Sequence, residues 1–282
     1  MTDWTSSQTL ALQGAIAQKV SLILVGVCIH EFLASIAFDL RLVTKLDSRP
    51  LLVRAVKWVY ICCRYCNLAT CLGLVFLFGS HGVSHCSVVV RVTTSSCTAA
   101  VLCGSVLLFI RVGVIWKWDV RIKAVFALLF FGIAAVLLYT LVSVHSTFDA
   151  TPGLTGSACD LSDIKSDLPY LCAFLALDAS LLFFYFWGLW RRRYESSSAL
   201  WDTLRRQSFV YLAVAVVLEI PALVFVALDY NEFVILIFMV PYICMLPIAT
   251  ARLYRSLTSF ITMSDQCTTS ESALQDSNHR DQ

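Results

Sequence analysis

The stretch FYFWGLWRRRY, residues 184–194, is the clearest sign of the fold class of this chain. Five of its first seven residues are aromatic, and three consecutive arginines follow directly after Trp190. A helix in the core of a water-soluble protein has no reason to end in this way, whereas a helix that reaches a lipid headgroup layer does. Trp187 and Trp190 suit the depth of the headgroups, and the arginines suit contact with anionic lipid. The stretch therefore predicts the cytoplasmic end of a membrane-spanning helix.

The composition of the whole chain agrees with a membrane protein. Of the 282 residues, 59% are hydrophobic and 14% are charged, whereas soluble domains are about 45–50% apolar and about 25% charged. The net charge of +2 argues against nucleic-acid binding through a broadly basic surface. No connection between apolar segments has the apolar content to bury a core of its own, so we expect no second domain.

Seven windows are long and apolar enough to cross a hydrocarbon layer about 30 Å thick, which takes about 20 helical residues. The predicted fold class is therefore all-α, a polytopic seven-transmembrane-helix bundle. Residues 1–19 are predicted to be a short extracellular N-terminus, residues 20–255 the bundle, and residues 256–282 a cytoplasmic amphipathic segment with a disordered tail. The seven windows are residues 20–40, 58–78, 96–116, 122–144, 169–190, 208–228 and 233–254.

The distribution of lysine and arginine predicts the orientation of the bundle. Seventeen of the 21 Lys and Arg residues fall in the connections on one side and in the C-terminal tail, and three fall on the other side. Because basic residues accumulate on the cytoplasmic side, the N-terminus is predicted to lie outside and the C-terminus inside. The cytoplasmic surface that would face a partner is predicted to contain Arg111, Arg191, Arg192, Arg193, Arg205 and Arg206.

The N-terminal residues predict how the chain enters the membrane. The first nineteen residues lack both a basic start and a short apolar run before a small-residue cleavage site, so a cleaved signal peptide is not expected. The first apolar window is then expected to act as an uncleaved signal anchor. This interpretation predicts an integral membrane protein that follows the secretory pathway to the plasma membrane.

Ionisable residues inside a membrane are costly and indicate function or a buried ion pair. Glu31 and Arg64 lie at the same predicted depth on neighbouring helices, so an intramembrane ion pair between them is predicted. Asp178 and Glu219 lie nearer the middle of the membrane and are candidates for ligand contact or protonation switching.

Prolines near these carboxylates predict deformable helices. Pro221 removes a backbone hydrogen bond close to Glu219. The last window contains Pro241 beside Tyr242, and Pro247 follows six residues after Pro241. We therefore count Asp178, Glu219, Pro221, Pro241 and Tyr242 as ligand or switch candidates. A static bend and a packing role explain the same residues.

Eleven of the twelve cysteines fall into two groups by compartment, and Cys267 lies in the predicted cytoplasmic tail. Those inside the apolar windows are interpreted as small hydrophobic packing residues, namely Cys28, Cys62, Cys63, Cys66, Cys71, Cys103 and Cys244. Four others lie at or near the predicted outer face, which is oxidising. A disulfide between Cys97 and Cys159 would hold the large outer loop over the bundle, although four cysteines allow three complete pairings and the sequence does not choose among them.

Several chemistries are not expected. The chain has no GxxxxGK[ST] phosphate loop, no HExxH and no G-x-S-x-G motif. The last apolar window has no lysine that would form a retinal Schiff base. We accordingly predict that the protein is not an enzyme and has no cofactor and no metal site.

Three stretches carry a family resemblance: EFLASIAFDLRLVTKL at residues 31–46, the RY of CRYCNL at residues 63–68, and FIRVGVIWKWDVRIKAVFALL at residues 109–129. They resemble an uncharacterised family of seven-helix, receptor-like membrane proteins of mushroom-forming fungi, defined by a domain of unknown function. The chain departs from that pattern at Gly113, where a tyrosine is common, and at Phe38 and Asp39, where an aspartate–tyrosine pair is usual. The resemblance implies a receptor-like fold and no established ligand.

The leading hypothesis is an orphan receptor-like protein that senses a small or apolar molecule and signals through its basic cytoplasmic loops. A link to a heterotrimeric G protein rests on architecture alone, because neither an Asp-Arg-Tyr triplet nor an Asn-Pro-x-x-Tyr pattern is present. One alternative is a small-molecule or proton-linked transporter that uses Asp178 and Glu219. A second alternative is a membrane scaffold without a ligand.

Overall fold

The computed structural model describes most of the predicted bundle. It covers residues 7–44, 51–79, 86–143, 168–192, parts of 217–228, and 234–256 with Thr258. Within these residues, all regular secondary structure is helical. The helices are α1 (Ser7–Ala34), α2 (Ile36–Thr44), α3 (Leu51–Gly79), α4 (Cys86–Ile115), α5 (Val120–Ser143), α6 (Leu168–Arg192) and a C-terminal helix (Val234–Ser256).

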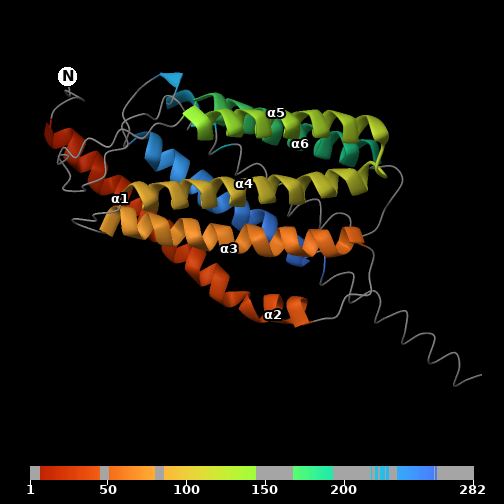
Figure 1. Ribbon diagram of the computed structural model, residues 1–282, viewed down its shortest axis with the longest axis horizontal. Coiled ribbons are helices and arrows are strands. Elements are labelled where there is room, and N and C mark those ends of the chain that lie inside the picture. The colour runs from red at the N-terminus through yellow and green to blue at the C-terminus, as the bar shows by residue number, and fades with distance from the viewer. Residues whose placement is uncertain are drawn as a thin grey trace, which may run out of the picture.

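The helices form a bundle in which α4 occupies a central position. It packs against α3 on one side and against α6 on the other, while α1 packs on α3 and α5 packs on α6. Figure 1 shows these long helices lying roughly along one direction, with the C-terminal helix, in blue, crossing behind them. The chain alternates in direction from α1 to α3 to α4 to α5, so every second helix end lies at the same end of the bundle.

Among the residues that the structure describes, four helices are long and apolar enough to cross a membrane: Leu12–Ala34, Val53–Leu77, Val88–Ile115 and Val234–Ser256. Large apolar side chains also point outward from the bundle. Leu128 and Phe131 on α5 are 74% and 76% exposed, which an aqueous surface would disfavour and a lipid surface would accept. These features confirm the predicted all-α class and are consistent with an integral membrane protein.

The first predicted window, residues 20–40, is wrong as a single helix because the chain breaks at Ser35. The Ser35 hydroxyl donates to the carbonyl oxygen of Glu31 at 2.7 Å, and the Asp39 amide resumes helical bonding to the carbonyl oxygen of Ser35 at 3.2 Å. Such back-bonding of a serine competes with the regular ladder and bends helices. The short helix α2 therefore leaves the line of α1, as Figure 1 shows.

A polar run does not interrupt α4. The stretch TTSSCT, residues 93–98, lies inside this helix, where the hydroxyls of Thr93 and Ser95 donate to the carbonyl oxygens of Val89 and Val92 at 2.8 and 3.0 Å. Because these hydroxyls are satisfied within the helix, the run is compatible with an apolar environment.

The contact between α3 and α4 is close because Gly73 faces Thr93. A Cβ atom at residue 73 would lie 2.9 Å from the Thr93 Cβ atom and closer still to its hydroxyl oxygen. Small residues at membrane helix interfaces allow backbones to approach in this way.

We expect Gly73→Ala to destabilise the bundle by about 1–3 kcal/mol through overpacking. The double variant Gly73→Ala/Thr93→Gly moves the Cβ atom from one helix to the other and should recover part of this loss. Unfolding in mixed detergent micelles, followed by tryptophan fluorescence, measures both. Equal stability of Gly73→Ala and wild type would show that α3 and α4 can move apart to accommodate the methyl group without a loss in the free energy of unfolding.

The aromatic end of α6 packs on the turn between α4 and α5. The Trp116 indole donates to the carbonyl oxygen of Phe184 at 3.0 Å, and the Phe184 ring contacts the Phe126 ring edge-on at a centroid distance of 5.4 Å. In contrast, Trp187 and Trp190 are 49% and 73% exposed. Half of this aromatic run therefore fixes α6 against its neighbours, and the exposed tryptophans remain available to lipid.

Candidate functional site

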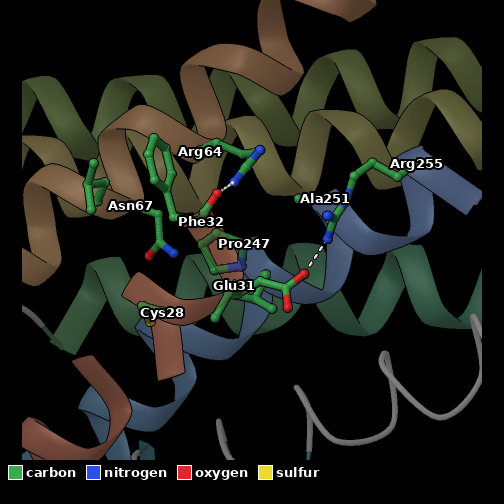
Figure 2. Close-up of a pocket in the computed structure, with 10 residues that line it drawn as sticks. Cys28, Glu31, Phe32, Arg64, Asn67, Pro247, Ala251 and Arg255 are labelled. Atoms are coloured by element: carbon green, nitrogen blue, oxygen red, sulfur yellow. Dashed lines mark hydrogen bonds and ion pairs between the residues drawn. The ribbon is translucent and has the colours of Figure 1, made fainter. Parts of the chain in front are cut away.

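A pocket lies where α1, α3 and the C-terminal helix meet. The empty space between its walls is about 330 Å³, including its open mouth. Figure 2 shows side chains from the three helices converging on it. The lining residues are Cys28, Glu31 and Phe32 from α1, Arg64, Asn67 and Leu68 from α3, and Pro247, Ile248, Ala251 and Arg255 from the C-terminal helix. We call this site the charged pocket.

Glu31 joins α1 to the end of the C-terminal helix. Its two carboxylate oxygens accept hydrogen bonds from the guanidinium groups of Arg252 and Arg255, one from each. The Glu31 side chain is 12% exposed, whereas those of Arg252 and Arg255 are 46% and 20% exposed. One largely buried carboxylate therefore holds two cations, and this ion triad has a net charge of +1.

Arg64 makes the second ionic contact at the pocket. Its guanidinium pairs with the Asp39 carboxylate of α2, and both side chains are only 6% exposed. The same guanidinium donates to the carbonyl oxygen of Phe32 at 2.9 Å and lies 4.8 Å from the centre of the Phe32 ring. The Tyr60 hydroxyl completes the group by donating to Asp39 at 2.8 Å.

The predicted Glu31–Arg64 ion pair is replaced by these two separate contacts. Both residues line the charged pocket, as their equal predicted depth implied, but the break at Ser35 brings Asp39 of α2 to Arg64. Glu31 instead pairs with the C-terminal helix, which is far from α1 in the sequence. Asp39, Arg252 and Arg255 were therefore missed, and their only sequence signal is charge next to an apolar segment.

A second buried polar group lies among α4, α6 and the C-terminal helix. The Asp178 carboxylate accepts hydrogen bonds from Ser105 and from Tyr242, each at 3.1 Å. All three residues are buried, with Asp178 4% exposed. The structure thus brings together Asp178 and Tyr242, two of the predicted switch candidates, and adds Ser105.

The other switch candidates are less informative. Glu219 lies outside the described residues, and its predicted role stays a prediction. Pro221 is half-buried in a helical segment, and Pro241 is half-buried in the C-terminal helix directly before Tyr242. Pro247 lines the charged pocket. The C-terminal helix has two polar contact regions: Tyr242, which contacts Asp178, and the pair Arg252 and Arg255, which contacts Glu31. Pro241 lies beside the first region, and Pro247 lies near the second.

Basic residues gather at one end of the bundle, where α4 and the C-terminal helix end and where α3 and α5 begin. We call it the basic end. Its described members are Arg41, Arg54, Lys57, Lys117, Arg121, Lys123, Arg191, Arg252 and Arg255. At the opposite end the described basic residues are Lys19 and Arg91.

The predicted partner-facing arginines are only partly at the surface. Arg111 is 9% exposed, so it does not belong to a partner-facing surface; it lies on a face of α4 that packs into the bundle, near Tyr185 of α6. Arg191 is exposed, with its guanidinium 5.9 Å from the centre of the Trp116 ring. The side chain of Arg192 and the residues Arg193, Arg205 and Arg206 lie outside the described part.

The cysteines show one arrangement that the sequence did not predict. Cys28, Cys71 and Cys244 come from α1, α3 and the C-terminal helix, and their sulfur atoms all lie within 4.8 Å of one another. They are buried in one apolar cluster with Val25, Val240 and Ile248. The predicted Cys97–Cys159 disulfide stays a prediction because Cys159 lies outside the described residues.

Chemically, the ion pairs at this site connect α2 to α3 and α1 to the C-terminal helix. Paired guanidinium and carboxylate groups in a low-dielectric environment exchange partners at a high energetic cost, so they keep one arrangement until a competing charge binds.

Comparisons with protein-family models, curated proteins and solved structures found no match for this chain.

Proposed function

We propose that this chain is a receptor-like integral membrane protein with seven membrane helices, an outer N-terminus and a cytoplasmic C-terminus, in the plasma membrane. A small or apolar molecule outside would shift the C-terminal helix relative to its neighbours. The basic end would report this shift to a cytoplasmic partner. The resemblance to the fungal seven-helix family supports the same class.

One observation carries this proposal: a single helix with two internal prolines holds both polar contact regions. Tyr242 connects it to Asp178 of α6 in the interior, and Arg252 and Arg255 connect it to Glu31 of α1 at its end. Prolines interrupt backbone hydrogen bonding and make a helix deformable. A change at the interior contact is therefore coupled mechanically to the charged pocket, which lies beside the basic end.

The charge distribution supports the orientation. The basic end contains most of the described lysine and arginine residues, as expected for the cytoplasmic side. A partner with an acidic surface, of which a heterotrimeric G protein is the example that the architecture favours by analogy, would bind there.

The test is co-purification of the detergent-solubilised chain with a heterotrimeric G protein in the absence of nucleotide. We expect the complex to form with wild type, to dissociate on addition of GTP, and to be lost in Arg191→Ala/Arg192→Ala/Arg193→Ala. The matched control Lys19→Ala/Arg91→Ala removes charge at the opposite end and should retain the complex. Absence of a complex with wild type would reject G-protein coupling.

The transporter and scaffold alternatives give different results in companion measurements. A carrier that uses Asp178 would lose substrate or proton flux in Asp178→Asn vesicles, whereas a receptor shows no flux in either form. A scaffold would show no loss of partner binding or flux when the three arginines or Asp178 are neutralised. Only the folding of the chain would change.

A further inference from the structure

We propose that Cys28, Cys71 and Cys244 form a three-sulfur site for a soft monovalent metal ion, Cu(I), inside the bundle. The proposal is independent of receptor function. It rests on three thiols that come from three different helices and lie close together. The regular spacing of residues along one helix does not explain such a cluster. All three are thiols in the structure, with exposures of 4%, 0% and 0% in chain order.

The distances suit a trigonal site. In a trigonal site the metal and its three sulfur ligands lie in one plane. With metal–sulfur bonds of about 2.3 Å, the sulfur atoms are then roughly 4 Å from one another. The three sulfur atoms lie within 4.8 Å of one another, so small side-chain rotations suffice to close the site. Thiolate ligands select Cu(I) or Zn(II) among the common ions.

The number of ligands favours Cu(I). Zn(II) in proteins takes four ligands, drawn from Cys, His, Asp or Glu and, in open sites, water. The three cysteines belong to one cluster with the apolar side chains of Val25, Val240 and Ile248. Among the described residues, the group within 4.8 Å contains no fourth His, Cys or carboxylate ligand.

An outer shell and an entry path are also present. Asn67 lies one helical turn before Cys71 and within hydrogen-bonding reach of the Cys28 sulfur, and its buried side-chain carbonyl oxygen has no partner in the structure. Cys28 itself lines the charged pocket, whose open mouth gives the site an entry path.

Charge balance supports a thiolate centre at this position. Each thiol that ligates the ion releases one proton, so Cu(I) with two or three thiolates leaves a net negative centre in an apolar environment. The ion triad of Glu31 with Arg252 and Arg255 has a net charge of +1, and Glu31 lies one helical turn from Cys28. This excess positive charge offsets part of the burial cost.

The test titrates Cu(I) into the reduced, detergent-solubilised full chain without oxygen, against a chromophoric Cu(I) chelator. The background is Cys62→Ser/Cys66→Ser, because these two sulfurs lie 3.7 Å apart on the exposed face of α3 and form a competing pair. We expect one tightly bound equivalent, with three sulfur ligands by X-ray absorption. Cys28→Ala, Cys71→Ala and Cys244→Ala should each lose it.

Two further variants make the test specific. Cys63→Ala removes a buried thiol of α3 that bonds the Ala100 carbonyl oxygen, and it should bind Cu(I) as the background does. Asn67→Ala should weaken binding about 10–100-fold, as outer-shell changes do.

Thiol mapping tests the site without any change at the three cysteines. Cu(I) should protect Cys28, Cys71 and Cys244 together from alkylation, measured at a denaturant concentration at which these buried thiols react in the metal-free chain. Unchanged alkylation, two-sulfur coordination, preference for Zn(II) over Cu(I), or a disulfide between two of the three cysteines would each overturn the proposal.

Discussion

Replacing Asp39 by alanine is expected to destabilise the folded bundle by about 3–5 kcal/mol, because it leaves the Arg64 guanidinium buried without its carboxylate. Both side chains of this pair are 6% exposed, so water does not replace the lost partner. Asp39 also accepts the Tyr60 hydrogen bond at 2.8 Å, which is lost at the same time. The measurement is the midpoint of unfolding in mixed detergent micelles.

A double-variant cycle separates the ion pair from other effects. Arg64→Leu should be destabilising by a similar amount, and Asp39→Ala/Arg64→Leu should cost less than the sum of the two single changes. Arg41→Ala, an exposed basic residue of the same helix α2, should change stability by less than about 0.5 kcal/mol. Strict additivity of the two single variants would contradict the buried pair.

Glu31→Gln should release the end of the C-terminal helix from α1. Two charge-assisted hydrogen bonds are weakened together, and each such bond contributes about 1.5–3 kcal/mol. Local opening of the last two helical turns, residues 249–256, is then expected to become about 10–100-fold more frequent. Hydrogen exchange of these backbone amides, followed by mass spectrometry, measures the change.

The controls for this variant follow from the geometry. Arg252→Gln and Arg255→Gln should each produce a smaller increase, because Glu31 keeps one partner. Asp119→Asn removes an exposed carboxylate at the same end, which bonds the Arg121 amide and not the C-terminal helix, and it should leave exchange unchanged. Unchanged exchange in Glu31→Gln would mean that the ion triad does not fasten this helix.

The all-α class, the apolar helices and the depth of Glu31 and Arg64 follow from the order of the residues alone. Apolar runs of about 20 residues ending in aromatic and basic clusters predict membrane helices because lipid imposes a fixed thickness and excludes unpaired backbone groups. The same counting placed Glu31 and Arg64 at one level, and both do line one pocket. Asp178 and Tyr242 were likewise identified from chemistry alone and meet in the interior.

Which residues pair becomes visible only in the folded bundle. A break of one residue at Ser35 turns Asp39 toward Arg64, and helix periodicity does not predict such a local competition for a carbonyl oxygen. The contacts of Glu31 with Arg252 and Arg255, and of Cys28 with Cys71 and Cys244, join segments far apart in the chain. Their pairing depends on which helix lies beside which, and hydrophobicity fixes the depth of a residue without fixing its neighbours.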